Sequence, residues 1–334
     1  MSKVAVRACG NPSQPSNVPR PKEMQVDPQA RTILETIATL APDADPMAND
    51  AQWLADFRYQ TALLKTFSGE PEPVHAITHL LLPSETGPLV VRLYRPKPGP
   101  LPLLLHIHGG GAIAGSIDGH DPALRALANR TGWLVAAPAY RFAPEHHFPA
   151  QLDDSWTALT GLVAQAAALD IDASRIVVSG DSIGGTLATA LAARAIAESG
   201  PALSGQILLY PNTDLRSETD YPSRRSEDGN IIDAASLERQ IDLYLASPDA
   251  RTDPRASPIL AENLIALPPT LLVTCENDPL RDEGEAYGRR LREAGVAVDH
   301  HRFDGMIHAF LQFGGRVDAT SRLLDRIAAW LKSR

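Results

Sequence analysis

A serine stands between two glycines in the segment Gly-Asp-Ser-Ile-Gly at residues 180–184. A β-branched apolar run precedes this segment and small residues follow it, which predicts a buried strand, a sharp turn and a helix. In such a turn the glycines let the backbone pack closely, and the serine hydroxyl projects beside a helix N-terminus that favours negative charge. The chemistry that this arrangement favours is nucleophilic attack by Ser182.

A nucleophilic serine needs a base, and the base needs a group that orients it. Ten histidines compete for the role of the base. His308 alone lies in a post-strand loop after the serine, at the sheet edge where the Ser182 hydroxyl would emerge. Asp278, in the loop after the preceding strand, is the best placed acid, and Glu276 is the alternative. The predicted catalytic residues, Ser182, Asp278 and His308, follow the chain order of α/β-hydrolases.

Three contiguous glycines follow His108 at residues 109–111, directly after an expected buried strand. A backbone without side chains can turn its N–H groups toward a ligand. We therefore expect Gly109 and Gly110, with the N–H of Ile183, to form an oxyanion hole, while His108 anchors the loop. A plain flexible loop is the alternative. A phosphate-binding loop is disfavoured, because no Gly-Lys-Ser/Thr follows.

The segments that must position these residues alternate between strands and helices. The expected strands span about 74–82, 88–95, 103–107, 133–139, 175–179, 206–210, 269–275 and 296–303. The expected helices between and after the later strands span about 121–131, 150–168, 187–198 and 317–332, with another through Tyr287, Leu291 and Ala294. This alternation predicts an α/β fold, in which a mostly parallel sheet is covered by helices on both faces.

Two regions lie outside the alternation. Residues 27–69 contain two expected amphipathic helices, for which a cap over a pocket and packing on the sheet flank are equally favoured. Residues 212–255 form an insertion beyond a strand end, on the face where ligands bind in open α/β sheets, and are the second candidate piece of a cap. The predicted organisation is a flexible arm at 1–26, cap helices at 27–69, core at 70–211, a cap insertion at 212–255 and core at 256–334.

Composition excludes several classes of partner. The net charge of −9 argues against nucleic acid or an anionic membrane surface. No apolar run is long enough to span a membrane, and the first residues lack a secretory leader, so we expect a cytoplasmic protein. The two cysteines, Cys9 and Cys275, lie in different contexts and are expected to be free thiols.

Five motifs together resemble those of the bacterial hormone-sensitive lipase family of esterases, in the order of that family. They are His-Gly-Gly-Gly at 108–111, Tyr-Arg-Phe-Ala-Pro-Glu-His at 140–146, Gly-Asp-Ser-Ile-Gly-Gly at 180–185, Asp-Pro-Leu-Arg-Asp-Glu-Gly at 278–284 and Gly-Met-Ile-His at 305–308. The resemblance covers about residues 70–333. It implies an α/β-hydrolase fold with an eight-stranded sheet and a helical cap, a serine carboxylesterase acting on short- to medium-chain acyl esters, no metal or cofactor, and a possible homodimer.

This chain departs from the family pattern at three positions. Ile183 stands where the family usually has alanine, Phe142 where it usually has leucine, and Cys275 where glycine is common. Ile183 would still donate through its backbone, while its side chain could reshape the wall beside the nucleophile. An acyltransferase, an amidase or a lactonase with the same catalytic residues stays open. A non-catalytic receptor on this fold is disfavoured, because His308 is present.

Overall fold

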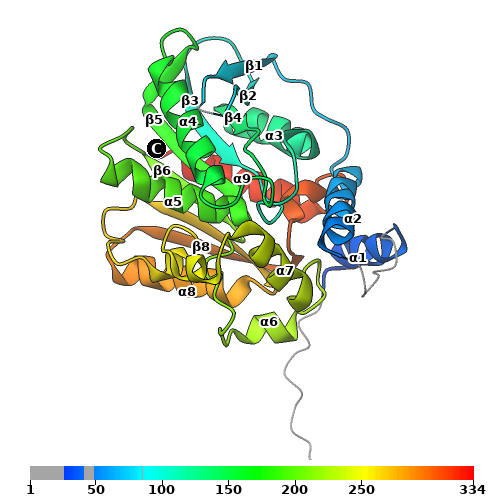
Figure 1. Cartoon of the computed structure of the whole chain (residues 1–334). Helices are drawn as coiled ribbons and strands as arrows, with labels where there is room; N and C mark the ends of the chain where they lie inside the picture. Colours follow the sequence, from blue (N-terminus) through cyan, green and yellow to red (C-terminus); the bar gives the residue numbers. More distant parts are fainter. Residues whose placement is uncertain (1–25, 41–48, 85) are drawn as a thin grey trace, which may run out of the picture.

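Figure 1 shows the computed structural model of the chain, which describes residues 26–40, 49–84 and 86–334. The predicted flexible arm at 1–26 falls outside this range except for its last residue. Residues 41–48, which join the two N-terminal helices, and Cys9 also lie outside the described residues.

One eight-stranded sheet forms the centre of the molecule, in the order β1-β2-β4-β3-β5-β6-β7-β8. The strands are β1 (Ala76–Leu82), β2 (Leu89–Arg95), β3 (Leu101–Ile107), β4 (Leu134–Pro138), β5 (Ile171–Asp181), β6 (Gly205–Leu209), β7 (Thr270–Asn277) and β8 (Val298–Ile307). β2 runs antiparallel to β1 and β4, and the other neighbours are parallel. The predicted eight-stranded, mostly parallel sheet is confirmed.

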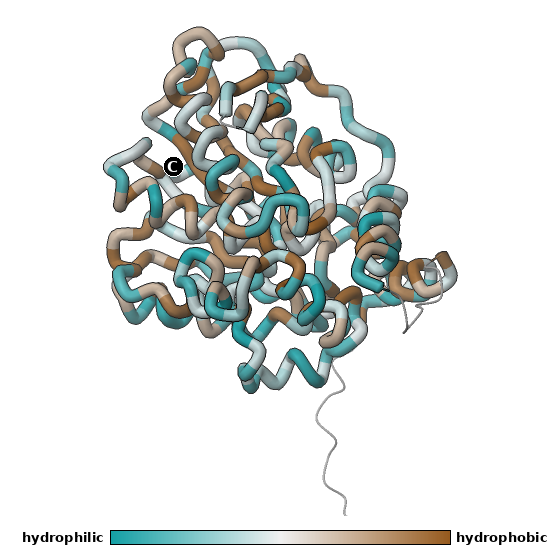
Figure 2. Tube along the Cα trace, viewed as in Figure 1, coloured by the Kyte–Doolittle hydropathy of each residue, from teal (hydrophilic) through white to brown (hydrophobic). Residues whose placement is uncertain are grey.

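Helices cover both faces of the sheet because its parallel strands are apolar on both sides. β3 and β4 are buried along their whole length. On one face the strands pack against α3 (Ile117–Thr131) and α9 (Asp318–Leu331). On the other they pack against α4 (Ala150–Ala164), α5 (Ile183–Ala197) and α8 (Arg281–Glu293). Figure 2 shows hydrophobic residues concentrated in the strands between these two layers.

A third group of helices lies beyond the sheet edge at which the parallel strands end (Figure 1). From the N-terminal region come α1 (Pro28–Leu40), α2 (Asp50–Leu63) and the 3₁₀ helix η1 (Leu64–Phe67). From residues 212–255 come α6 (Pro222–Ser226), α7 (Ala234–Tyr244) and η2 (Pro248–Thr252), whereas η3 (Pro258–Leu260) packs with α5 and α8 on the face of the sheet. α2 and α7 share a buried apolar cluster, to which Leu54, Leu237 and Ile241 belong. The two regions outside the alternation therefore meet in space.

The structure differs from the sequence-based expectation at several element ends. β8 runs on to Ile307, so His308 directly follows a strand and does not end a five-residue loop. The extension is possible because the β7–β8 register shifts between Cys275 and Asn277, after which Asn277 pairs with Ile307. α5 begins at Ile183 rather than at 187, and α4 ends at Ala164 rather than at 168. α3 begins at Ile117, capped by the Ser116 hydroxyl, which accepts from the Gly119 N–H.

Candidate active site

Ser182 lies at the turn between β5 and α5 with a backbone φ of 56° and ψ of −126°. A positive φ is costly for a residue with a side chain, so the surrounding structure must enforce it. The flanking glycines allow this packing. A Cβ at Gly180 would overlap the carbonyl of Gly184, and a Cβ at Gly184 would overlap the carbonyl of Ile107. The turn thus depends on the absence of side chains on either side of Ser182.

The structure brings Ser182, His308 and Asp278 into one hydrogen-bonded chain. His308 Nε2 lies 2.9 Å from Ser182 Oγ, and His308 Nδ1 lies 2.8 Å from Asp278 Oδ2. Asp278 is fully buried, and its other oxygen accepts from the Leu280 N–H at 2.8 Å. The alternative acid, Glu276, lies elsewhere and accepts from the Gly305 N–H at 2.7 Å. The arrangement can transfer a proton from the serine to a fixed imidazole.

Tyr210 holds the imidazole from the side. Its ring meets that of His308 edge to face, with 4.9 Å between the ring centres. The phenol oxygen accepts from the Leu311 N–H at 3.3 Å, and burial raises the pKa of Tyr210 well above its usual range. Tyr210 therefore stays neutral and restricts the orientation of His308. Sequence reasoning used it only as the end of a strand.

The prediction that Gly109 is a donor of the oxyanion hole needs correction. The Gly109 N–H donates to Asp181 Oδ1 at 2.9 Å, so it is not available to a substrate oxygen. The N–H groups of Gly110, Gly111 and Ile183 have no acceptor among the described residues. All four residues border the two cavities beside Ser182. The N–H groups open to a ligand are thus those of Gly110, Gly111 and Ile183.

Asp181 is the hub of a buried polar network behind the nucleophile. Besides Gly109, its carboxylate contacts His106 Nε2 at 3.3 Å and His120 Nε2 at 3.4 Å. Burial alone would raise the pKa of Asp181, but the charge of His120 and the two imidazole hydrogen bonds hold it well below its usual range. Burial would likewise lower the pKa of His120, but the Asp181 charge raises it. The two residues form a buried ion pair that fixes the start of the glycine loop.

His108 holds the same loop as a neutral ring. Burial, with the nearby charge of His120, lowers the pKa of His108 to about 3. Its Nδ1–H donates to the Gly109 carbonyl at 2.7 Å, and its ring stacks on Tyr140 with 4.4 Å between centres. The expectation that His108 anchors the loop is confirmed by these contacts.

Cys275 is a buried free thiol beside the acid of the site. Burial, together with Asp278, raises the pKa of its thiol well above the usual range, so the thiol stays protonated.

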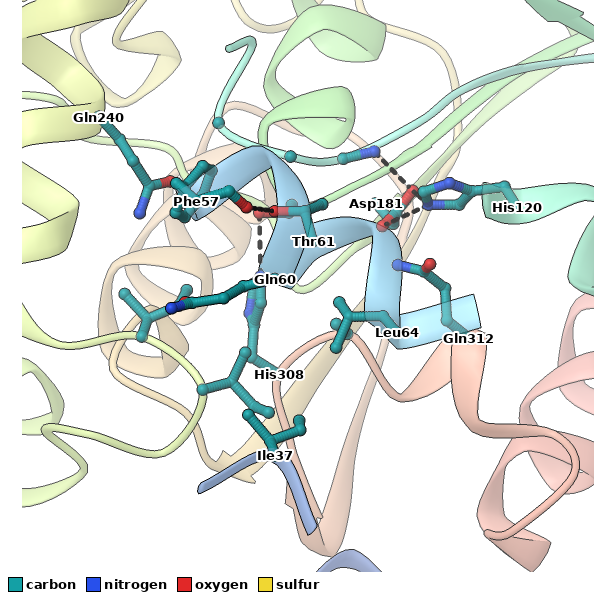
Figure 3. A pocket seen from close by; sticks show the side chains of 17 residues that line it. Ile37, Phe57, Gln60, Thr61, Leu64, His120, Asp181, Gln240, His308 and Gln312 are labelled. Carbon is teal, nitrogen blue, oxygen red and sulfur yellow. Dashed lines mark hydrogen bonds and ion pairs between the residues drawn. The ribbon is translucent and has the colours of Figure 1, made fainter. Parts of the chain in front are cut away.

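Two cavities meet at Ser182. The larger, of about 110 Å³, is bounded by α1, α2, the glycine loop and the segment after β8 (Figure 3). The smaller, of about 20 Å³, lies toward α7 and is mostly apolar. Side chains of the larger cavity include Ile37, Phe57, Gln60, Leu64, Gln240, His308 and Gln312. Side chains of the smaller include Ile183, Leu215, Leu237, Ile241 and Tyr244.

Comparison with known proteins places this geometry in a family. A family model described as alpha/beta hydrolase fold matches residues 104–312. The ethyl acetate hydrolase of Pseudomonas putida is 40% identical over 271 residues, which are 78% of this chain and 83% of that protein. The arylesterase of Saccharolobus solfataricus is 32% identical over 86% of this chain and 93% of its own. A hyperthermophilic esterase from the archaeon Pyrobaculum calidifontis superposes with a TM-score of 0.86 at 34% identity, covering 92% of this chain and 98% of that one.

The chain belongs to the bacterial hormone-sensitive lipase family of α/β-hydrolase esterases. In the described part of this esterase, no group of three or more His, Cys, Asp or Glu side chains is arranged to hold a metal ion. None of the helices that the structure describes is long and apolar enough to cross a membrane.

Besides the Gly111 N–H, sequence reasoning missed four side chains of the site of this esterase: Asp181, His120, Tyr210 and Gln312. Asp181 adjoins the nucleophile, so its position in the motif was the one available signal. Its imidazole partners are 61 and 75 residues away in the chain, and no local pattern links them to it. Gln312 follows the last strand in an apolar stretch, where a single amide carries no periodicity.

Proposed function

We propose that this protein is a serine carboxylesterase that hydrolyses short- to medium-chain acyl esters through Ser182, His308 and Asp278. The observation that carries the proposal is the chain of contacts of 2.9 and 2.8 Å that links the three side chains at the junction of two cavities. Its relatives support the reaction class, since they include an ethyl acetate hydrolase and an arylesterase. The small size of the second cavity favours the short end of the acyl range.

The proposed reaction begins when Ser182 Oγ attacks the ester carbonyl while His308 Nε2 takes its proton. Asp278 keeps the imidazole in the required tautomer and stabilises the imidazolium that forms. The negative oxygen of the tetrahedral intermediate accepts from the N–H groups of Gly110, Gly111 and Ile183, each of which is free in the structure. Ile183 also opens α5, whose N-terminus favours the same charge.

The second half of the reaction uses the same groups in the opposite sense. His308 returns the proton to the alcohol oxygen, which leaves, and the acyl group stays on Ser182. Water then attacks this acyl-enzyme as His308 removes its proton, and collapse of the second intermediate releases the carboxylic acid and restores Ser182. Neither step calls for a cofactor.

We further propose that residues 27–69 and 212–255 act together as a cap over the pocket, on a core formed by 70–211 and 256–334. The proposal rests on the residues that border the larger cavity, which come from α1, α2, η1 and residues 231–240 as well as from the core. A possible homodimer and a cytoplasmic location stay predictions of the sequence. Light scattering of the purified protein and cell fractionation would test them.

The experiment that tests the proposed function is hydrolysis of p-nitrophenyl esters of increasing acyl length. We expect wild-type rates to be highest for short acyl groups and Ser182→Ala to reduce turnover by about 10⁴- to 10⁶-fold. Ser333→Ala, the same change at an exposed site in the last residues, is the matched control. Undiminished activity in Ser182→Ala would show that another group is the nucleophile. A wild type inactive on every ester would refute the function, and anilide, lactone and alcohol-acceptor assays would then separate the amidase, lactonase and acyltransferase alternatives.

A further inference from the structure

We propose that the larger cavity recognises esters whose alcohol part carries a neutral hydroxyl group, and that the Gln312 side chain binds this hydroxyl. The substrate class is therefore short-chain monoesters of diols and polyols. This inference rests on the proposed esterase function and assigns a specificity-determining residue to it.

The position of His308 decides which cavity receives the alcohol part. His308 must deliver a proton to the leaving alcohol oxygen, so that oxygen has to lie on the His308 side of Ser182. His308 borders the larger cavity and not the smaller one. The smaller cavity, at about 20 Å³, has room for little more than one small group, which suits the methyl of an acetyl ester. The acyl group therefore enters the smaller cavity and the alcohol part the larger.

Gln312 presents an unpaired amide to the larger cavity. The residue is only 4% exposed, and its side chain has no hydrogen-bond partner within the described residues. Its backbone is fixed, since its N–H donates to the Ala309 carbonyl at 3.0 Å and its carbonyl accepts from Ser68 Oγ at 2.7 Å. Figure 3 shows the amide extending from η4 (Phe310–Phe313) toward the space beside Leu64. The amide atoms are not among the fully enclosed polar atoms that lack a partner, so they face the open cavity, where a ligand hydroxyl can pair with them and gain about one hydrogen bond.

A second glutamine reinforces the polar character of this cavity. Gln240 is 8% exposed, and its Nε2 donates to Ser236 Oγ at 3.2 Å. Its carbonyl oxygen has no partner in the part of the chain that the structure describes. Gln240 therefore offers an acceptor, while Gln312 offers both a donor and an acceptor. A hydroxyl group, which donates and accepts, matches this pair better than an ether or a hydrocarbon does.

The charges around the cavity favour a neutral group over an anion or a cation. None of the described residues that border it is Lys or Arg. Asp181, the one acidic residue on the described border, already accepts from Gly109, His106 and His120. His120, which also borders the cavity, is already paired with Asp181, so among the described residues a phosphate or carboxylate would find no free counter-ion and an ammonium no free carboxylate. The hydrogen-bonding group is accordingly an uncharged hydroxyl.

The test compares monoacetates of linear diols, from ethanediol to hexanediol, with alkyl acetates of matched length. Lengthening the diol places its free hydroxyl at increasing distance from the ester, which identifies the distance at which the hydroxyl reaches the Gln312 amide. We expect kcat/KM of wild type to favour one diol ester over its alkyl match by about 5- to 10-fold, the contribution of one hydrogen bond. Gln312→Leu should bring this ratio to about one. Gln312→Met, which keeps the side-chain length, should do the same and guards against a folding defect in the leucine variant.

The ratio within each substrate pair is the readout, because a general loss of activity cancels in it. Gln52→Leu is the control, since Gln52 is an exposed residue of α2 whose side chain, within the described residues, bonds only Asp56 of the same helix. It should leave both the ratio and the rates unchanged. A wild type that treats all acetates alike, or a preference that survives both Gln312 variants, would overturn the inference while leaving the esterase function intact. A wild type that hydrolyses no acetate would overturn both.

Discussion

The catalytic edge of the sheet and the cap satisfy their polar groups in different ways. By the catalytic edge we mean residues 108–111, 181–183, 278 and 308. Its buried acids, Asp181 and Asp278, are both fully engaged by imidazole and backbone N–H groups. The cap side of the pocket instead carries the glutamine Gln240, whose carbonyl oxygen is unpaired within the described chain. The comparison teaches that the acids which orient the catalytic groups are paired before the substrate arrives, whereas the oxyanion N–H groups and the glutamines that line the pocket are left for the substrate to complete.

The same contrast appears in how the helices are packed. Eleven of the fifteen residues of α5 are buried, whereas α2 buries only Leu54 among its fourteen. The polar attachments of α2 include Arg58, whose Nε donates to the Ile113 carbonyl at 2.8 Å and whose guanidinium pairs with Glu145 at 2.7 Å. They also include Asp50, which pairs with Arg239 of α7. A helix held by a few polar contacts opens more readily than one held by apolar burial. We therefore expect changes at the edge to affect turnover and changes in the cap to affect selectivity or local stability.

The largest effect should come from the acid of the catalytic edge. In Asp278→Asn the carboxylate that orients His308 is lost, and we expect kcat to fall by about 10⁴-fold with little change in KM. Steady-state kinetics on p-nitrophenyl acetate would measure it. Glu276→Gln is the matched control, because Glu276 contacts the Gly305 N–H and not the histidine. Equal losses in the two variants would remove Asp278 from its proposed role.

A smaller loss should follow from Asp181→Asn, which breaks the buried ion pair without touching Ser182, His308 or Asp278. The glycine loop would lose its charged anchor, so we expect kcat to fall by about 10²- to 10³-fold, as for a damaged oxyanion hole. Leaving His120 without its counter-ion should also cost about 3–5 kcal/mol of unfolding free energy, measured by urea denaturation.

The control for this change is Asp118→Asn, which removes an acid from α3 whose side chain is 72% exposed. It should affect neither kcat nor the urea midpoint noticeably. If Asp181→Asn unfolds at the wild-type urea concentration with full activity, the network has no part in holding the loop.

Ile183→Ala should change selectivity more than rate. The side chain borders the smaller cavity, so its truncation makes room for a longer acyl group. We expect kcat/KM for the butyrate ester relative to the acetate to rise about 10-fold. Ile196→Ala, on the same helix but 44% exposed, should leave the ratio unchanged. An unaltered ratio in Ile183→Ala would mean that the acyl group does not enter the smaller cavity.

The smallest effect concerns the attachment of the cap and depends on pH. Hydrogen bonding to Arg58 lowers the pKa of Glu145 from its ordinary 4.5 to about 2. Because the folded pKa is the lower one, the pair stabilises the fold above about pH 4.5, and this contribution is lost as the pH falls toward 2. The Glu145 side chain is 54% exposed, so the gain should stay below about 1 kcal/mol.

Thermal unfolding of wild type and Glu145→Gln would measure this contribution. The wild type should have the higher Tm at about pH 7, and the difference should narrow below about pH 4.5 and vanish at about pH 2. Glu262→Gln, at an exposed acid, is the control. A difference in Tm that is the same at both pH values would show that the ion pair is not its source.

The sequence allowed the sheet and the three central side chains to be predicted for the same reason. Parallel strands end at one edge, so residues that directly follow buried strands meet there whatever their separation in the chain. Ser182, Asp278 and His308 follow β5, β7 and β8 and are found together. The assignment needed only the order of the strands and the loops that follow them, so it held although the expected end of the last strand was four residues too early.

What could not be predicted depends on contacts across the fold. Gly111 and not Gly109 is a free oxyanion donor because the Asp181 carboxylate accepts from the Gly109 N–H. This contact joins the ends of the neighbouring strands β3 and β5. The end of β8 rests on a register shift opposite Cys275, which no pattern in β8 itself reveals. Neither feature has a local sequence signal, because each is set by which residue lies opposite and not by which residue comes next.

Within the five residues 180–184, the two glycines are required for folding, whereas Ser182 is required only for the proposed catalysis. A Cβ atom at Gly180 or Gly184 would overlap a carbonyl of the neighbouring backbone, so replacement of either glycine would prevent the turn from folding. Ser182 already bears the unusual backbone angle with a side chain in place, so other small side chains fit there without further rearrangement. A mutant library screened for folding alone should therefore retain Gly180 and Gly184 but accept substitutions of Ser182. The same library screened for turnover should retain all three, and the apex is where a different nucleophile could enter an unchanged scaffold.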